Sequence, residues 1–381
     1  MTAERKKILM VGFFDVFKHK RLTRQVHYLK DSFDITVAGF FEGQLLEGVR
    51  CYPIEPCFRK MNIAEKALTA LLILAGRYEQ VYNRLYGFDR LLADLGQEQF
   101  DLIIAHDFKP LPLVEKIRKK APVLINAHEY HFDMGTKSFF IDRFNNYLLN
   151  NYFLKYSHYV TVCQGIADEY GKNYSKKFQV ITNAHEYVDI LPSPVQQEKI
   201  RMIYHGLAHP ARQLEGLIEM MDHLGDRFQL DLMLTTLFDS GSYVNQLRKL
   251  CGNRSDVRII EPVHPDEIVP FCNQYDIGIF VWPDTNINFK YIFPNKFFEF
   301  VQSRLMIATG PSVEVRKVVD QYELGVVSPD FDPRSMANML QNLTSEQISK
   351  YKQQTHAHAL ELSSEIQMQK LAMIIENILV C

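Results

Sequence analysis

Asn295, Lys296 and Glu299 are polar residues within an otherwise apolar run, residues 291–300 (YIFPNKFFEF). Pro294 suits the first turn of a helix, so a helix is expected to start near it. Asn295 and Lys296 would then lie among unpaired backbone amides, where anions bind, and Glu299 would share their face. A diphosphate at Lys296 and a ribose diol at Glu299 would account for all three residues. A solvated lysine and a satisfied helical glutamate would account for them equally well.

A second stretch, residues 204–217 (YHGLAHPARQLEGL), also has residue types suited to an anion. Gly206 would lie in a strand-to-helix turn, with Arg212 just before the helix or in its first turn. A guanidinium beside free helical amides suits a phosphate group. Residues 329–333 (PDFDP) contain an Asp-x-Asp pattern, but Asp332 before Pro333 is better interpreted as a helix cap than as a metal ligand.

In the first half of the chain, two apolar runs each end in a histidine followed by an acid: His106 with Asp107, and His128 with Glu129. Ligands of parallel sheets bind at the carboxyl ends of the strands, so these four side chains would project together into a cleft. A histidine at a strand end is often only a hydrogen-bonding loop residue. The same ending on two neighbouring strands favours a site.

The elements that would hold these residues are short apolar runs alternating with helical patterns, which predict parallel sheets covered on both faces. The predicted strands lie within residues 7–14, 33–41, 100–107, 121–129, 157–163, 177–184, 200–206, 228–235, 257–262, 275–282, 305–310 and 325–329.

Residues 191–199 (LPSPVQQEK) break this pattern with two prolines and predict a linker. We therefore expect an α/β protein with two doubly wound domains, residues 1–190 and 200–345, facing each other across a cleft. Residues 346–381 are expected to form C-terminal helices that return towards the N-terminal domain.

Residues 64–95 form a long amphipathic helical pattern in which basic residues and tyrosines border the apolar face. A helix facing the core is the favoured interpretation. The alternative is a helix at a membrane surface, or a groove for a lipid-linked acceptor.

Composition narrows the function classes. The 381 residues carry a formal net charge of -2, and no basic–aromatic motif is present, which argues against a nucleic-acid partner. The six cysteines are scattered without metal-ligand spacing, and no run approaches the roughly 20 apolar residues of a membrane span. A reducing, cytoplasmic setting is expected.

Taken in order, these stretches resemble the retaining glycosyltransferases of the GT-B fold, family 4 (glycosyltransferase group 1). FDLIIAHDFKPLPLVEKI and VLINAHEYH resemble that family's paired N-terminal strands, and VTVCQGIADEYGKNYSKKFQVITNA resembles its strand–helix–strand segment ending at Asn183. YHGLAHPARQLEGLIEMM is similar to the segment that holds the donor diphosphate. FPNKFFEFVQSRLMIATGP is similar to the PNKxxEY helix and the strand after it. The resemblance covers most of the chain.

The resemblance implies a role for each candidate in the second half of the chain. Arg212 and Lys296 would bind the donor diphosphate, Glu299 the ribose, and Gly206 and Asn295 would complete the nucleotide site.

For the first half, the resemblance implies that His128 contacts the donor sugar or assists at its anomeric centre, with Glu129 as the second catalytic candidate. His106, Asp107 and Asn183 would shape the cleft and the acceptor side.

The implied activity is transfer of a sugar, with retention, from a nucleotide-sugar to a glycan or lipid-linked acceptor in bacterial surface polysaccharide synthesis. No cofactor or metal is expected, because cationic side chains and helix amides would neutralise the leaving diphosphate. The membrane surface remains open as a further partner, at the inner face.

Two alternatives remain open. One is a nucleotide-sugar epimerase. The other is a non-catalytic member that binds a glycan or a partner protein, suggested because Tyr291 stands where the family often has a first glutamate.

Overall fold

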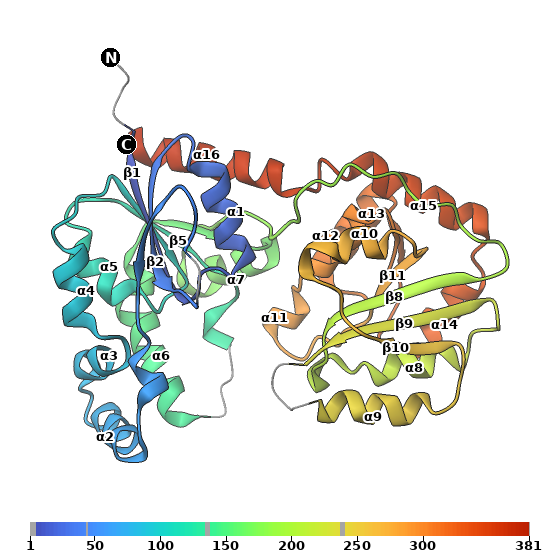
Figure 1. Ribbon diagram of the computed structural model, residues 1–381, viewed down its shortest axis with the longest axis horizontal. Coiled ribbons are helices and arrows are strands. Elements are labelled where there is room, and N and C mark those ends of the chain that lie inside the picture. The colour runs from blue at the N-terminus through green and yellow to red at the C-terminus, as the bar shows by residue number, and fades with distance from the viewer. Residues whose placement is uncertain (1–4, 43–44, 134–137, 237–240, 381) are drawn as a thin grey trace. The chain divides into compact units, whose positions relative to one another are not determined.

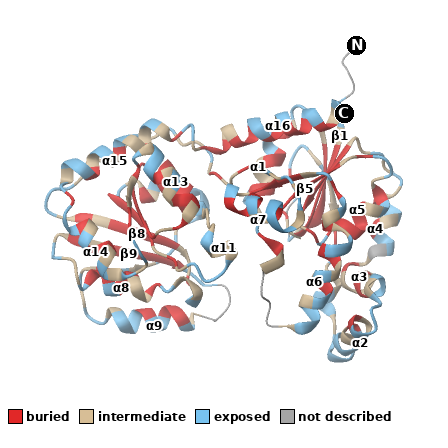
Figure 2. Cartoon of the chain, turned by 180° about the vertical axis from the view of Figure 1, so that it is seen from behind, coloured by how far each residue is buried: buried red, intermediate tan, exposed pale blue. Residues whose placement is uncertain are grey.

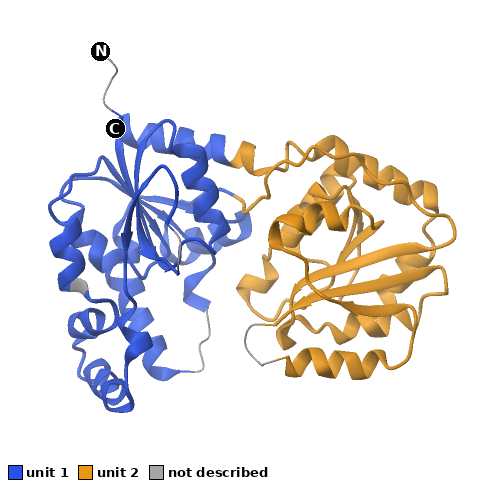
Figure 3. Cartoon of the chain, in the orientation of Figure 1, with its two compact units in different colours: residues 1–181, 368–381 blue, residues 182–367 orange. Residues whose placement is uncertain are grey.

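A computed structural model describes residues 5–42, 45–133, 138–236 and 241–380 of the chain. The chain divides into two compact units (Figures 1 and 3): unit 1 comprises residues 1–181 and 368–381, and unit 2 comprises residues 182–367. Residues 182–190 and 346–367 thus belong to unit 2. Residues 182–190 were expected in the N-terminal domain.

Unit 1 is built on a seven-stranded sheet in the order β3-β2-β1-β4-β5-β6-β7, and every recorded strand pair is parallel. The predicted apolar runs form all of these strands except β3, which was not predicted. The strands are β1 (Lys7–Asp15), β2 (Asp34–Phe40), β3 (Arg50–Pro53), β4 (Leu102–His106), β5 (Val123–Asn126), β6 (His158–Thr161) and β7 (Gln179–Val180).

Helices connect these strands, as expected for parallel pairing, which needs crossover connections. The helices of unit 1 are α1 (Lys20–Leu29), η1 (Cys57–Lys60), α2 (Ile63–Leu74), α3 (Tyr78–Tyr86), α4 (Phe88–Leu95), α5 (Leu111–Ile117), η2 (His131–Asp133), α6 (Phe139–Asn151), η3 (Phe153–Lys155) and α7 (Gln164–Tyr174). The C-terminal helix α16 (Ser364–Val380) buries Leu371 and Ile375 in the same core as Ile8 and Met10 of β1.

The predicted helical stretch 64–95 is divided into α2, α3 and α4. Gly76 and Gly87 follow the first two helices with left-handed backbone (φ +69 and +63), a conformation that glycine adopts without strain. Helix α2 buries only Thr69 and Ile73 (Figure 2). The side of α2 that carries Thr69 and Ile73 is therefore buried, as expected of a helix facing the core, whereas its other apolar residues are exposed.

Unit 2 is built on a six-stranded sheet in the order β10-β9-β8-β11-β12-β13, again with parallel pairing. Five of the six strands lie within the predicted runs, and β8 extends one residue beyond its run. They are β8 (Ile200–Leu207), β9 (Phe228–Thr235), β10 (Val257–Ile260), β11 (Ile277–Phe280), β12 (Met306–Thr309) and β13 (Gly325–Val327). The helices are η4 (Pro210–Arg212), α8 (Glu215–Met221), α9 (Ser242–Cys251), η5 (Pro265–Glu267), α10 (Ile268–Cys272), α11 (Ile287–Lys290), α12 (Asn295–Gln302), α13 (Val313–Tyr322), α14 (Pro333–Gln341) and α15 (Ser345–His358).

Helix α12 is fixed in the core of unit 2 by its aromatic residues. Phe297, Phe298 and Phe300 are fully buried in the cluster that also contains β8, β11 and β12 residues. The Phe300 ring occupies the space beside Gly278 of β11, where any larger residue would collide with it. This packing determines where the first turn of α12, which carries Lys296, lies.

Candidate functional site

Lys296 is a buried cation without a hydrogen-bond partner among the described residues. It lies in the first turn of α12, which begins at Asn295 directly after Pro294. Its side chain is only 5% exposed, and its Nζ lies 3.4 Å from the centre of the Tyr204 ring and 4.4 Å from that of Trp282. The aromatic faces partly compensate the charge, but they satisfy none of the three N–H donors.

Arg212 brings a second positive charge to the same place. It ends η4, its Nη1 donates to the Leu207 carbonyl at 2.7 Å, and its guanidinium carbon lies 4.6 Å from the Trp282 ring centre. A Cβ on Gly206 would lie 3.6 Å from both Arg212 Nη1 and Lys296 Nζ. Gly206 has φ +119, a backbone conformation that residues with a side chain rarely adopt. The two cations therefore lie next to a stretch of backbone that carries no side chain.

The electrostatics of this cation cluster favour an anion. Burial, followed by the nearby charge of Arg212, holds the pKa of Lys296 well below its usual range, whereas Glu299 acts in the opposite direction. Burial and the charge of Lys296 likewise hold the pKa of His205 well below its usual range, so His205 is neutral. A desolvated positive charge is costly unless it is paired, and an anionic ligand would supply the missing partner.

The other predicted nucleotide-site residues lie next to this cluster within unit 2. Glu299 Oε2 lies 3.3 Å from His205 Nε2, and its side chain is 18% exposed. Asn295 is exposed, and its Oδ1 accepts a hydrogen bond of 2.7 Å from Nδ2 of Asn183. Gly206, Arg212, Lys296 and Glu299 are therefore brought together, while Asn183 contacts the group through Asn295.

Three residues of this group were not predicted from the sequence: Tyr204, His205 and Trp282. Tyr204 and His205 lie inside an apolar strand pattern, which gives no sign of a site. Trp282 carried a usable signal, because it is the only tryptophan of the chain and directly precedes the polar loop between β11 and α11, the segment that comes before α12.

Unit 1 contains a separate cluster of histidines around Asp107, at the ends of β4 and β5. Asp107 has left-handed backbone (φ +62), and its Oδ1 accepts a hydrogen bond of 2.9 Å from the backbone N–H of His128. Its Oδ2 lies 3.4 Å from His128 Nδ1, and its Oδ1 lies 3.0 Å from His131 Nε2. His106 Nδ1 lies 3.1 Å from His128 Nε2. The predicted neighbours His106, Asp107 and His128 are thus in direct contact.

His106 and His128 are neutral and Asp107 is charged. Burial lowers the pKa of His128 to about 3 and holds that of His106 well below its usual range. Burial alone would raise the pKa of Asp107, but His128 and His131 together hold it well below its usual range. With Nδ1–H of His128 towards Asp107, His128 Nε2 is left as an acceptor for Nδ1–H of His106. The arrangement fixes the orientation of the His128 ring.

Glu129 is placed differently from the other three residues of the predicted group. It is exposed, and the recorded hydrogen bond that it makes is through its backbone carbonyl, which accepts from the Tyr170 hydroxyl at 3.0 Å. Two histidines outside the predicted group join the cluster instead. His131 contacts Asp107, and the His19 ring stacks on that of His128 with centres 4.7 Å apart.

The neutral histidines of unit 1 make stability depend on pH. The folded-state pKa values of His128 (about 3), His19 (about 4) and His106 lie below the value of 6.5 expected in the unfolded chain. Below pH 6.5 the unfolded chain therefore binds protons that the folded chain does not, and the free energy of unfolding falls as pH falls.

Each of the three histidines should contribute a slope of about 1.4 kcal/mol per pH unit between pH 6.5 and pH 4. Urea unfolding across this range measures the total slope. His19→Asn should remove about a third of it, because asparagine keeps the cap that His19 provides to α1 but does not titrate. A stability that stays constant from pH 6.5 to pH 4 would contradict this assignment of charge.

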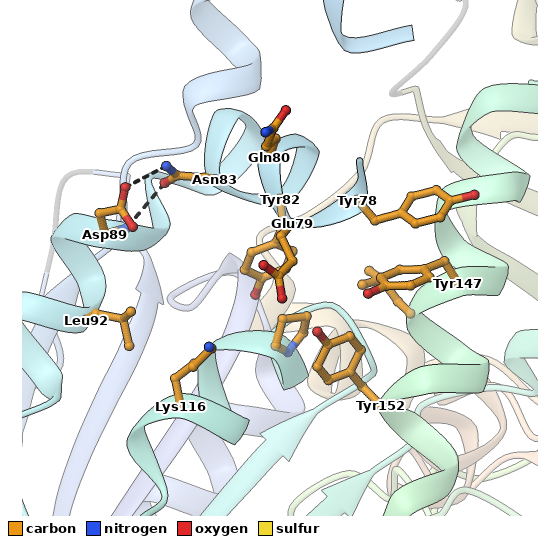
Figure 4. A pocket seen from close by; sticks show the side chains of 12 residues that line it. Tyr78, Glu79, Gln80, Tyr82, Asn83, Asp89, Leu92, Lys116, Tyr147 and Tyr152 are labelled. Carbon is orange, nitrogen blue, oxygen red and sulfur yellow. Dashed lines mark hydrogen bonds between the residues drawn. The ribbon is translucent and has the colours of Figure 1, made fainter. Parts of the chain in front are cut away.

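Two pockets of unit 1 contain none of the predicted site residues. One is lined by tyrosines of α3 and α6 together with Glu79, Asp89 and Lys116, and has a volume of about 350 Å³ (Figure 4). The Tyr78 and Tyr147 rings stack at its edge with centres 4.1 Å apart. The other, of about 550 Å³, lies among η1, α2, α3 and α6 and is mostly apolar. The first pocket was not predicted, because it is formed by side chains from separate helices. The second lies beside residues 64–95, where a groove for a lipid-linked acceptor is one of the alternatives.

Within the described ranges, no group of three or more His, Cys, Asp or Glu side chains is arranged to hold a metal ion. Asp332, the doubtful carboxylate of the PDFDP stretch, caps α14, and its side chain accepts a hydrogen bond from the Arg334 backbone N–H at 2.8 Å.

Comparison with known proteins gives a likeness of fold. No protein-family model and no curated protein sequence match the chain. Among solved structures, it resembles sucrose-phosphate synthase from Thermosynechococcus elongatus (TM-score 0.73, 10% identity, 99% of this chain and 100% of that chain covered). It also resembles HepE of Anabaena in complex with UDP and glucose (TM-score 0.67, 13% identity, 98% and 100% covered). A third similar structure is the lipopolysaccharide outer core galactosyltransferase WaaB (TM-score 0.65, 11% identity, 98% and 99% covered). With two parallel α/β units and these neighbours, the chain has the GT-B fold.

Proposed function

We propose that this protein is a glycosyltransferase that moves a sugar from a nucleotide-sugar donor to a glycan or lipid-linked acceptor. The observation that carries the proposal is the buried ammonium of Lys296, which has no hydrogen-bond partner among the described residues and faces Arg212 across Gly206. A nucleoside diphosphate has the charge and the acceptor oxygens that this site lacks. The complex of HepE with UDP and glucose supports the choice of ligand, since HepE shares the fold.

The donor would be held by unit 2. Lys296 and Arg212 would bind the diphosphate, and Gly206 would let it approach the backbone of β8 closely. Glu299 would accept hydrogen bonds from the ribose hydroxyls, and Asn295 would lie at the edge of the nucleotide, held by Asn183. In this assignment the two cations, together with the first amides of α12, stabilise the negative charge of the departing diphosphate. We therefore propose that transfer needs no metal ion and no other cofactor.

The sugar would be contacted by the histidine cluster of unit 1. His128 is the proposed catalytic residue: Asp107 orients its ring through Nδ1, and a sugar hydroxyl would replace His106 as the partner of Nε2. Glu129 is kept as a second candidate. In the proposed mechanism the sugar is transferred with retention, because the acceptor attacks the anomeric carbon from the face that the diphosphate leaves. His128 would form a hydrogen bond with a sugar hydroxyl near that carbon.

The acceptor proposed is a glycan of bacterial surface polysaccharide, free or lipid-linked. WaaB, a lipopolysaccharide outer core galactosyltransferase with the same fold, supports this class of acceptor. The proposed location is the cytoplasm, at the inner face of the membrane.

The experiment that tests the activity measures release of nucleoside diphosphate from sugar nucleotides, with and without lipid-linked glycan extracted from bacterial membranes. A transferase releases diphosphate in proportion to acceptor and places the sugar on the lipid fraction. Turnover of the donor that is independent of acceptor would instead indicate a nucleotide-sugar epimerase. Nucleotide binding without any turnover would favour the non-catalytic alternative. That alternative is considered because Tyr291 stands where the family often has a first glutamate.

A further inference from the structure

Helix α2 presents an apolar face to solvent. Ile63, Ala67, Leu71 and Leu74 recur at spacings of three and four residues, so they share one face of the helix. Ile63 is 87% exposed and Leu71 61% exposed. The opposite side of α2, including Ile73, faces the body of unit 1. A helix that is apolar on both sides is normally buried, so the outer face of α2 lacks a partner in this chain.

The start of α6 extends this surface. Phe139 is 63% exposed, and Phe140 and Ile141 are exposed beside it. Helices α2 and α6 pack against each other. Half of the large apolar side chains that are exposed in the described part of the chain belong to this surface. We call it the α2–α6 surface, made of Phe58, Ile63, Leu68, Leu71, Leu74, Phe139, Phe140 and Ile141.

The pocket of about 550 Å³ opens between the same helices. Its walls include apolar side chains such as Ile73, Phe140 and Phe144. The charged residues among those that line it are Lys66 and Lys109, both exposed, and no carboxylate is among its lining residues. An apolar chamber with cations alone at its edge is complementary to a molecule that combines an apolar chain with a negatively charged head group.

We propose that the α2–α6 surface docks onto an anionic phospholipid bilayer, with α2 lying in the interface and an acyl chain entering the adjacent pocket. Apolar residues of a short interfacial helix insert at the boundary between head groups and acyl chains, and lysines beside them attract anionic head groups. Among the described helices, none has the length and apolar character that a membrane span needs.

This inference gives the proposed membrane partner a docking surface. This inference rests on the proposed function in one respect: a lipid-linked acceptor is the reason why the enzyme would bind a membrane. Bilayer binding itself is measured without donor or acceptor, so that its failure and a failure of sugar transfer are separate results.

The test is co-sedimentation of the full chain with vesicles of phosphatidylcholine alone and of phosphatidylcholine mixed with phosphatidylglycerol. The wild type should sediment with the mixed vesicles and less with the neutral ones, and added salt should weaken binding to the mixed vesicles. The double variant Ile63→Glu, Leu71→Glu should bind the mixed vesicles about tenfold more weakly or worse. Lys66→Glu should weaken binding to the mixed vesicles alone.

The matched control is Leu250→Glu, which changes a leucine of α9 in unit 2 that is 56% exposed and should bind vesicles like the wild type. Unchanged thermal midpoints would show that the variants are folded, because all the substituted side chains are exposed. The proposal is overturned if the wild type stays in the supernatant with both vesicle types, or if the double variant sediments like the wild type. It is equally overturned if the wild type is a dimer that the double variant dissociates while neither binds vesicles.

Discussion

Lys296→Met is expected to weaken nucleoside diphosphate binding about tenfold to a hundredfold and, at the same time, to raise the thermal midpoint of the ligand-free protein. The two effects have one cause. Lys296 is 5% exposed, has no hydrogen-bond partner among the described residues, and has a pKa held well below its usual range by burial. Methionine has a similar shape without the charge, so the folded protein no longer carries an uncompensated buried cation.

The size of the effect on binding follows from the hydrogen bonds that the Lys296 ammonium would donate to the diphosphate and that methionine cannot make. Hydrogen bonds to charged groups contribute about 1.5–3 kcal/mol each. Loss of one such bond raises the dissociation constant about tenfold to a hundredfold. Isothermal titration with the nucleotide that binds the wild type measures this change, and calorimetry of the ligand-free proteins measures the midpoints.

Lys352 provides a matched control, because it is also buried but is fully paired. Its Nζ donates to Ser193 Oγ and to the Tyr275 carbonyl, and lies 3.6 Å from Asp276 Oδ1. Lys352→Met should therefore destabilise the protein by about 3–5 kcal/mol, since it removes the ion-pair partner of the buried Asp276 carboxylate, and should leave nucleotide affinity unchanged. A lowered midpoint for Lys296→Met, or wild-type affinity in that variant, would remove the basis for assigning Lys296 to an anion site.

His128→Ala is expected to lower kcat about 10²- to 10⁴-fold, the range typical of a side chain that acts on the reacting group. Nucleoside diphosphate affinity should be unchanged, because Lys296, Arg212 and Gly206 belong to unit 2 and His128 to unit 1. The readouts are steady-state sugar transfer and nucleotide titration. An effect on kcat without an effect on nucleotide binding separates a role at the sugar from a general loss of structure.

Two further variants test whether the effect on kcat is specific to His128. His27→Ala changes an exposed histidine of α1 and should leave kcat within about twofold of the wild type. Glu129→Gln separates the two catalytic candidates. Because Glu129 is exposed and no recorded hydrogen bond joins its side chain to the cluster, its effect on kcat should be smaller than that of His128→Ala. A kcat for His128→Ala close to that of the wild type would refute the proposed role of His128.

The parallel sheets could be predicted because their strands are buried on both faces and therefore read as continuous apolar runs. Strand β3 could not, since Arg50–Pro53 is short, lies at the sheet edge and includes a proline. The division of residues 64–95 into three helices could have been predicted from Gly76 and Gly87, whose positions suit helix ends. The exposure of Leu71 could not, because periodicity shows that a helix has an apolar face and not whether anything covers it.

In the candidate site, too, some residues could be predicted from the sequence and others could not. Lys296 and Glu299 could be singled out because charged residues are conspicuous in an apolar helix, and Pro294 indicates where that helix begins. The ring of Trp282 beside Lys296 and the bond between Asn183 and Asn295 depend on tertiary packing between segments distant in the sequence. Local patterns contain no information on such contacts.

The central claim is that unit 2 binds a nucleoside diphosphate, and a thermal-shift screen of the wild type with UDP, GDP, ADP, dTDP and CMP tests it most directly. A ligand present at about 100 times its dissociation constant adds roughly 2.7 kcal/mol to the free energy of unfolding, which is visible as a raised midpoint. We predict that one of the four diphosphates raises the midpoint, whereas the monophosphate CMP does so much less. If the protein is folded and none of the five nucleotides changes its midpoint, the assignment of Lys296 and Arg212 to a nucleotide site is contradicted.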